Sequence, residues 1–277
     1  MTSATSPRIV FLDIDGTYAS HGAVPAAHAD AVRRVRANGH RVLLCTGRPR
    51  SLLSPTMLAA GFDGLVCGAG AYAELDGEVL RDEVFPASLA QRTVDALHAH
   101  GAISLVESTE ALYVLAEARD AMERRAPDGD ASALQAAVWE DLRAARRVVE
   151  SLDGLSFAKI VTLSARAELA EIAAEIGPEV AAVETSIKDL GKGAGELYLA
   201  HVNKAVGMAA VVDRLGVGPE HVIACGDGPN DIEMLDYAGT AVGISGGHPD
   251  VLARADVVAQ GPEDAGLVAA FEELGLL

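Results

Sequence analysis

The sequence is poor in positive charge. Its 277 residues include 22 lysines and arginines against 40 aspartates and glutamates, which gives a formal net charge of −18 at pH 7. A nucleic-acid backbone or an anionic membrane surface would repel such a chain, so neither is expected as a partner. An anionic substrate must therefore be held by local cationic groups, because the overall field of the protein opposes its approach.

Long apolar runs and cysteines are also scarce. No apolar run approaches the ~20 residues that cross a bilayer, and residues 1–8 are too short and polar for a signal peptide. Cys45, Cys67 and Cys225 are widely spaced and lie in or beside apolar runs, so we expect reduced core thiols in a cytoplasmic protein. Hydrophobic residues make up 50% of the chain, a globular composition with enough length for two domains.

The most informative stretch is residues 9–17, IVFLDIDGT. Its four leading apolar residues predict a buried strand of a parallel sheet, because both faces of such a strand are covered. Asp13 and Asp15 follow directly, and uncompensated carboxylates at the end of a buried strand are costly. A hard cation such as Mg²⁺ prefers oxygen ligands of this kind and would compensate them.

Two alternatives fit parts of this stretch. In a simple turn, the aspartates would accept hydrogen bonds from nearby backbone donors. A calcium loop of the helix-loop-helix kind would need glycine at the position of Tyr18 and glutamate at that of Pro25. Neither is present, so the calcium loop is rejected.

The hydrophobic periodicity divides the chain into two patterns. Residues 1–85 and 201–277 alternate between strands and helices, which predicts a Rossmann-like doubly wound parallel sheet of the α/β class, with a hairpin at Asp76-Gly77. Residues 86–200 read instead as an inserted α+β domain, including a helical region at 117–150 that is broken at 127–130. We therefore expect a core domain of residues 1–85 and 201–277 and an inserted domain of residues 86–200.

Polar strings follow three of the predicted core strands. They are DIDGT (13–17), TGR (46–48) and GDGPND (226–231), and Lys204 opens a later helix for which Asn203 is the predicted N-cap. Ligands of doubly wound sheets bind outside the carboxyl ends of the strands. We expect these segments to meet there despite their separation in sequence.

This combination of strings and Lys204 resembles the haloacid dehalogenase-like superfamily, and the place and size of the insertion are similar to the type IIB cap of its Cof-type branch. The resemblance covers essentially the whole chain. It implies a Mg²⁺-dependent phosphatase that acts on a small phosphorylated metabolite such as a sugar phosphate. We expect the protein to be a monomer or homodimer. A phosphomutase of the same superfamily and a non-catalytic phospho-ligand-binding protein remain as alternatives.

The resemblance also implies a role for each matching residue. Asp13 would be the nucleophile that forms an aspartyl phosphate, and Asp15 would protonate the leaving oxygen and later deprotonate water. The metal ligands would be Asp13, the Asp15 carbonyl, Asp227 and Asp231, the last directly or through water. The phosphate would be bound by Thr46, Gly47, Lys204 and Asn230.

Some positions allow more than one interpretation. Asn230 followed by Glu233 is also a helix-capping pair, and Asp231 suits the first turn of a helix without any metal. Arg48 fits a structural ion pair at least as well as a substrate contact. Lys159, in an otherwise apolar strand, is the inserted-domain residue most worth testing. The family's usual Asn-Gly and Asn-Ala are replaced here by GAG (68–70) and SGG (245–247), both expected near the site.

Overall fold

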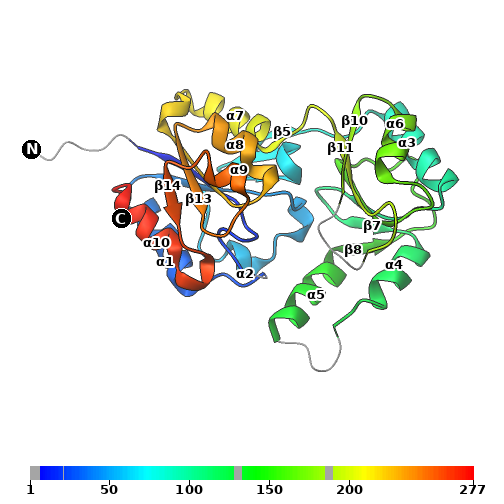
Figure 1. Ribbon diagram of the computed structural model, residues 1–277, viewed down its shortest axis with the longest axis horizontal. Coiled ribbons are helices and arrows are strands. Elements are labelled where there is room, and N and C mark those ends of the chain that lie inside the picture. Colours follow the sequence, from blue (N-terminus) through cyan, green and yellow to red (C-terminus); the bar gives the residue numbers. More distant parts are fainter. Residues whose placement is uncertain (1–6, 21, 128–132, 185–189) are drawn as a thin grey trace, which may run out of the picture. The chain divides into compact units, whose positions relative to one another are not determined.

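The computed structural model describes residues 7–20, 22–127, 133–184 and 190–277, and it divides into two compact units (Figure 1). The first unit contains Met1–Arg48, Leu53–Asp82 and Asn203–Leu277, and the second contains Pro49–Leu52 and Glu83–Val202. Residues 128–130 of the expected break at 127–130 lie outside the described residues.

The first unit is built on an eight-stranded sheet with the order β14-β13-β12-β1-β2-β3-β4-β5. All neighbouring strands are parallel except for β4 and β5, which add an antiparallel hairpin with its turn at Asp76-Gly77. The bounds are β1 (Ile9–Leu12), β2 (Arg41–Cys45), β3 (Gly64–Cys67), β4 (Tyr72–Leu75), β5 (Glu78–Asp82), β12 (Val222–Gly226), β13 (Thr240–Ile244) and β14 (Val257–Ala259). This is the doubly wound α/β core that the sequence predicts.

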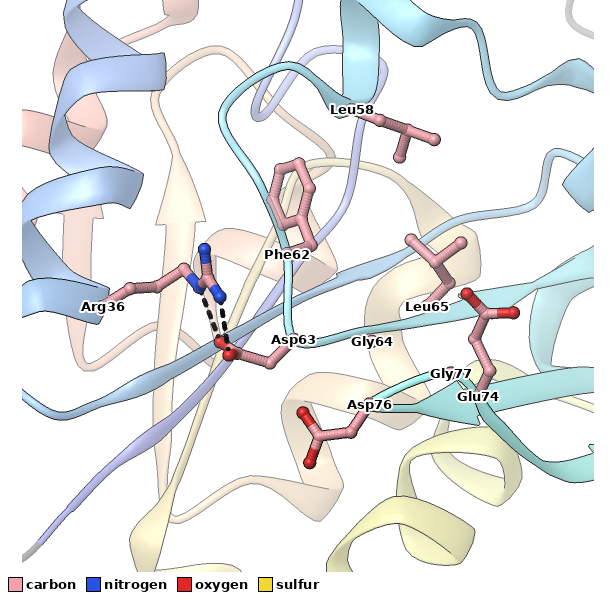
Figure 2. Close-up of a pocket in the computed structure, with 9 residues that line it drawn as sticks. All are labelled: Arg36, Leu58, Phe62, Asp63, Gly64, Leu65, Glu74, Asp76 and Gly77. Carbon is pink, nitrogen blue, oxygen red and sulfur yellow. Dashed lines mark hydrogen bonds and ion pairs between the residues drawn. The ribbon is translucent and has the colours of Figure 1, made fainter.

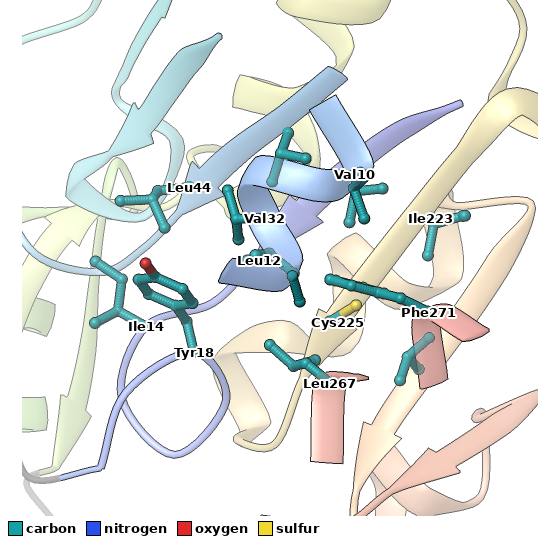
Figure 3. Packing of buried hydrophobic residues seen from close by; sticks show 14 of the residues in the cluster. Val10, Leu12, Ile14, Tyr18, Val32, Leu44, Ile223, Cys225, Leu267 and Phe271 are labelled. Atoms are coloured by element: carbon teal, nitrogen blue, oxygen red, sulfur yellow. The ribbon is translucent and has the colours of Figure 1, made fainter. Parts of the chain in front are cut away.

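Apolar side chains alternate across this sheet and create a core on each face. Val10 and Leu12 pack with residues of α1 and α10 on one face, whereas Phe11 and Leu43 pack with residues of α7 and α8 on the other. Figure 3 shows the first of these cores, where Phe271 lies among side chains of the central strands. The helices of the unit are α1 (Ala26–Ala37), α2 (Pro55–Leu58), α7 (Lys204–Leu215), α8 (Ile232–Tyr237), α9 (Pro249–Leu252) and α10 (Gly266–Glu273), with the short 3-10 helix η2 (Gly68–Gly70) after β3.

The second unit is an α+β structure with a six-stranded sheet in the order β10-β11-β9-β6-β7-β8. Its pairs are antiparallel apart from β7 and β8. The strands are β6 (Ile103–Glu107), β7 (Leu112–Val114), β8 (Arg146–Val148), β9 (Lys159–Ser164), β10 (Val180–Glu184) and β11 (Gly195–Leu199). The helices are α3 (Ala87–Ala99), α4 (Ala116–Glu123), α5 (Ala133–Ala145) and α6 (Leu169–Ile176).

Two features of this unit differ from the expectation. The helical region predicted to run to residue 150 ends at Ala145, and Arg146–Val148 forms β8, a parallel partner of β7. Pairing with an available sheet edge therefore overrides the helical pattern of this stretch. The second difference is that Pro49–Leu52, which follows the predicted phosphate-binding string, belongs to the second unit: Leu52 packs against its apolar cluster and the Ser51 hydroxyl donates to the carbonyl of Ser108 at 2.9 Å.

Among the described helices, none is both long and apolar enough to cross a membrane.

Candidate active site

The loop after β1 is folded back on itself by hydrogen bonds from its own backbone. The amide of Asp13 donates to the carbonyl of Cys225 at 2.9 Å, which continues the β1–β12 pairing, and the amide of Tyr18 donates to the carbonyl of Asp13 at 3.1 Å. Gly16 turns the chain with a φ of +92°, and a Cβ atom there would lie 2.4 Å from Oδ2 of Asp227. Only glycine therefore allows the loop to approach the Asp227 carboxylate this closely.

Lys204 joins two acidic residues from different strand ends. Its Nζ atom lies 2.6 Å from Oδ1 of Asp13 and 2.5 Å from Oδ1 of Asp231, and its side chain is completely buried. Lys204 is the first residue of α7, and the side chain of Asn203 caps this helix by accepting from the amide of Val206. The predicted cap is confirmed, and it places the ammonium group at the carboxyl edge of the sheet.

Close backbone packing brings the start of α7 to this edge. Gly70 has a φ of +103°, and a Cβ atom there would lie only 1.9 Å from the carbonyl oxygen of Asn203. A Cβ atom on Gly207, one turn into the helix, would lie 2.5 Å from Val66 and 2.9 Å from the Cα of Gly70. The GAG string that departs from the family pattern thus lets η2 pack directly against α7.

Asp231 organises the loop that carries Asp227. Its Oδ2 atom accepts hydrogen bonds at 2.9 Å from the amides of both Asp227 and Gly228, while Oδ1 contacts Lys204. Asp227 in turn accepts from the hydroxyl of Thr17 at 2.9 Å. Thr17 belongs to the DIDGT string, and the sequence does not indicate its role, because its partner Asp227 lies 210 positions away.

The carboxylates of Asp13, Asp227 and Asp231 form a candidate metal site, since each offers an oxygen within 4.8 Å of the others. Burial raises the pKa of Asp13, and the ammonium of Lys204 opposes this rise. Burial also raises the pKa of Asp227. Lys204 contacts Asp13 and Asp231, whereas Asp227 forms no ion pair among the described residues. The oxygen chemistry of the three carboxylates fits a hard divalent cation, which would supply further positive charge.

Asp15 and Arg48 form a bidentate ion pair. Nε and Nη2 of Arg48 each lie 2.7 Å from one carboxylate oxygen of Asp15. Arg48 therefore forms the structural ion pair that was one of its two interpretations. Its partner is Asp15, the predicted acid–base residue. Thr46 is buried beside them, and its hydroxyl accepts from the amide of Arg48 at 3.1 Å.

Gly47 and Asn230 lie close together at the same edge. A Cβ atom on Gly47 would be 3.7 Å from the side-chain nitrogen of Asn230, which is exposed. The N-cap of α8 is Asp231, and no capping bond from Asn230 is present among the described residues. The loop 245–247 also reaches this edge, where it lines a hollow of about 360 Å³ together with Asp15 and Asp227.

Lys159 belongs to the second unit, where it is the first residue of β9. It is 4% exposed, and its Nζ atom lies 3.2 Å from Glu107 and 3.1 Å from Glu196 across the sheet. Although burial alone would lower the pKa of Lys159, the two carboxylates raise it. The lysine is therefore part of a buried ion-pair network of the α+β sheet.

Another hollow of the first unit, of about 330 Å³, lies at the amino end of β3, and Figure 2 shows the residues that line it. It surrounds Asp63, just before β3, and the Asp76-Gly77 turn. Arg36 and Asp63 make a bidentate ion pair there, with distances of 3.0 and 2.9 Å. None of the strand-end strings contributes to this hollow.

Comparison with known proteins identifies the family. The model of the haloacid dehalogenase-like hydrolases matches residues 10–271. The chain belongs to these hydrolases, in their Cof-type branch, and its activity is that of a phosphatase.

Individual relatives agree with this assignment. YkrA of Bacillus subtilis strain 168, named provisionally as a phosphatase, is 26% identical over 98% of both chains. A protein of Streptococcus pyogenes, named provisionally as a bifunctional phosphatase and peptidyl-prolyl cis-trans isomerase, is 39% identical over 82 residues, and the match spans only 17% of its length.

Solved structures show the same fold. The subclass IIB sugar phosphatase BT4131 superimposes with a TM-score of 0.76 at 20% identity, covering 98% of this chain and 100% of that one. The phosphatase BT1666 from Bacteroides thetaiotaomicron has a TM-score of 0.76 at 24% identity and covers 98% and 96%. At this level of identity the likeness establishes the Rossmann-like core with a cap domain.

Proposed function

We propose that this phosphatase hydrolyses phosphomonoesters of small metabolites, of the sugar-phosphate type, through an aspartyl phosphate on Asp13 with the help of Mg²⁺. The observation that carries the proposal is the buried contact of Lys204 with Asp13 and Asp231 at 2.6 and 2.5 Å. It fixes one oxygen of Asp13 and leaves the other to attack phosphorus. It also places a permanent cation where an anionic phosphate would arrive on a strongly acidic protein.

The reaction has two steps in this scheme. In the first, the free oxygen of Asp13 bonds to phosphorus, the bond from phosphorus to the leaving oxygen breaks, and Asp15 gives that oxygen a proton. In the second, water bonds to phosphorus and gives a proton to Asp15, while the bond between phosphorus and Asp13 breaks. Inorganic phosphate is released, and both aspartates return to their starting protonation.

The other residues of the site bind and orient the phosphate. The Thr46 hydroxyl and the ammonium of Lys204 would contact its oxygens, and Gly47 would allow close approach of the backbone, with the Asn230 amide beside it. Mg²⁺, when bound by Asp13, the Asp15 carbonyl, Asp227 and Asp231, would neutralise charge between the nucleophile and the phosphate. Thr17 and Asp231 would keep Asp227 oriented through their hydrogen bonds.

Two observations support a small polyhydroxylated substrate. A relative of the same fold is named as a sugar phosphatase. The hollow beside Asp15 and Asp227 is lined by Ser245, whose hydroxyl suits hydrogen bonding to sugar hydroxyls, and by Ser20, whose hydroxyl donates to Glu263 and can still accept. Residues 86–200 are proposed as the cap domain that selects among such substrates. Cys45, Cys67 and Cys225 are buried core residues and none forms a disulfide, which supports a cytoplasmic location.

The test is to measure phosphate release from a panel of phosphorylated metabolites, with Mg²⁺ and after exhaustive chelation. Sugar phosphates should be hydrolysed only with the metal, and phosphate label should appear on the wild-type protein but not on Asp13→Asn. Formation of phosphate isomers in place of free phosphate would indicate a mutase, and binding without turnover would indicate a non-catalytic protein. Labelled Asp13→Asn would contradict the assigned nucleophile, and full turnover after chelation would contradict the metal.

A further inference from the structure

Arg48 makes a two-point contact with Asp15. Nε faces Oδ2 and Nη2 faces Oδ1, both at 2.7 Å, so the planar guanidinium matches the planar carboxylate. The Asp15 side chain is 52% exposed, and packing alone does little to limit its rotation. The orientation of its carboxylate is therefore determined by Arg48.

Arg48 itself is held from several sides. Its amide donates to the Thr46 hydroxyl, and its carbonyl accepts from the amide of Gly68 at 2.8 Å. Its third guanidinium nitrogen, Nη1, lies 3.8 Å from the sulfur of the buried Met57. The backbone of Arg48 is thus tied to Thr46 and to the loop after β3, while its guanidinium lies between Asp15 and Met57.

We propose that Arg48 is a positioning residue that orients the Asp15 carboxyl for its proton transfers. The inference rests on the acid–base role proposed above for Asp15. A proton passes efficiently only when donor and acceptor atoms are within hydrogen-bond reach in the right direction. Because Arg48 donates to both oxygens of Asp15, one of these oxygens can exchange its hydrogen bond for one to the substrate. The other oxygen stays bonded to Arg48. The carboxyl therefore stays aligned as its proton moves to the leaving oxygen.

The consequence depends on the leaving group. An alkoxide such as a sugar oxygen is a poor leaving group and needs its proton as the bond to phosphorus breaks. Nitrophenolate is stable as an anion and leaves without one. Loss of alignment in Asp15 should therefore slow transfer from an alkyl phosphate much more than from p-nitrophenyl phosphate.

The chain offers a matched control in Arg36 and Asp63. This pair has the same fork geometry and lies in the same unit, but at the amino end of β3 (Figure 2). Arg36→Met removes a bidentate pair without touching the carboxyl-edge strings. Any general effect of losing such a pair on stability should appear in both variants.

The experiment compares kcat/KM for an alkyl phosphate and for p-nitrophenyl phosphate in Arg48→Met, Arg48→Lys and Arg36→Met. This ratio includes events only up to the first irreversible step, which is transfer to Asp13. In Arg48→Met the alkyl phosphate should lose about 10- to 100-fold more than the aryl phosphate. Arg48→Lys, which keeps the charge without the fork, should show most of the same selective loss and serves alone if Arg48→Met does not fold. In Arg36→Met the relative rates should be unchanged.

Three outcomes would overturn the proposal. Equal losses on both substrates would make Arg48 a direct phosphate contact, and unchanged relative rates would make the ion pair purely structural. Full recovery by Arg48→Lys would assign the effect to charge and not to orientation. Asp15→Asn in the same assay separates this inference from its basis: if it shows no leaving-group preference, the acid–base role of Asp15 itself fails. If it shows the preference and Arg48→Met does not, only the role of Arg48 fails.

Discussion

Replacing Gly70 by alanine should test whether activity depends on the exact position of Lys204 relative to Asp13. The new Cβ would begin 1.9 Å from the carbonyl oxygen of Asn203, and real Cβ atoms essentially never come nearer than 3.0 Å. The two backbones must then separate by about 1.1 Å, and Lys204 is the next residue along the chain. A misplacement of about 1 Å costs on the order of 100-fold in rate.

The same substitution should also destabilise the protein. Alanine at a φ of +103° costs roughly 1–2 kcal/mol in the backbone, and forced packing adds roughly 1–3 kcal/mol. Gly39→Ala is the matched control, because its φ is +91° and nothing lies within 4 Å of the new Cβ. It should lose only the backbone contribution and retain full activity.

The assay is urea unfolding together with kcat/KM for an aryl phosphate, measured for both variants. We expect Gly70→Ala to be the less stable variant and to lose about 10- to 100-fold in kcat/KM. A folded Gly70→Ala with wild-type kcat/KM would show that the loop yields without moving α7. Equal losses of activity in the two variants would show that backbone strain, and not the contact with Asn203, is responsible.

Three further predictions concern buried groups. Burial raises the pKa values of Cys45 and Cys225, so a thiol reagent should label neither cysteine in the native protein and both in urea. Labelling of the native protein at the unfolded rate would contradict this. His28 accepts from the amide of Leu267 at Nε2, and burial lowers its pKa below 6.5. Because the unfolded state then binds the proton more readily, the free energy of unfolding should fall by up to about 1.4 kcal/mol per pH unit as pH drops below that value. His28→Gln should show a smaller fall, and an identical one would assign the effect elsewhere. Lys159→Met removes the buried ammonium between two carboxylates and should cost about 3 kcal/mol in urea unfolding, whereas a change below about 0.5 kcal/mol would place the pair among the weak ion pairs.

The sequence predicts the core fold well because its signals are local. Each buried strand is a short apolar run, and the polar string that follows it marks the carboxyl edge where the structure brings Asp13, Asp227 and Lys204 together. The Asn203 cap was predicted for the same reason, since a cap and its helix are adjacent in sequence. Such features can be predicted without knowing which distant residues they contact in the folded chain.

Features that depend on distant partners were missed or left open. Nothing beside Gly70 or Gly207 in the sequence indicates that they pack against one another, and the partner of Arg48 became evident only from the folded chain. The strand at Arg146–Val148 was predicted as helix, because its β structure arises from an edge that β7 provides.

The segment Pro49–Leu52 bears on how caps are exchanged between proteins. A cap transferred by cutting only at its two long junctions, near residues 83 and 202, would leave behind Leu52, which fills part of its apolar cluster, and Ser51, which bonds to Ser108. Recombination in nature or in the laboratory therefore has to replace three pieces of chain together, or repair the hole that the third piece leaves. A chimera that keeps the acceptor's own residues at 49–52 should fold well only when their shapes match the incoming cap.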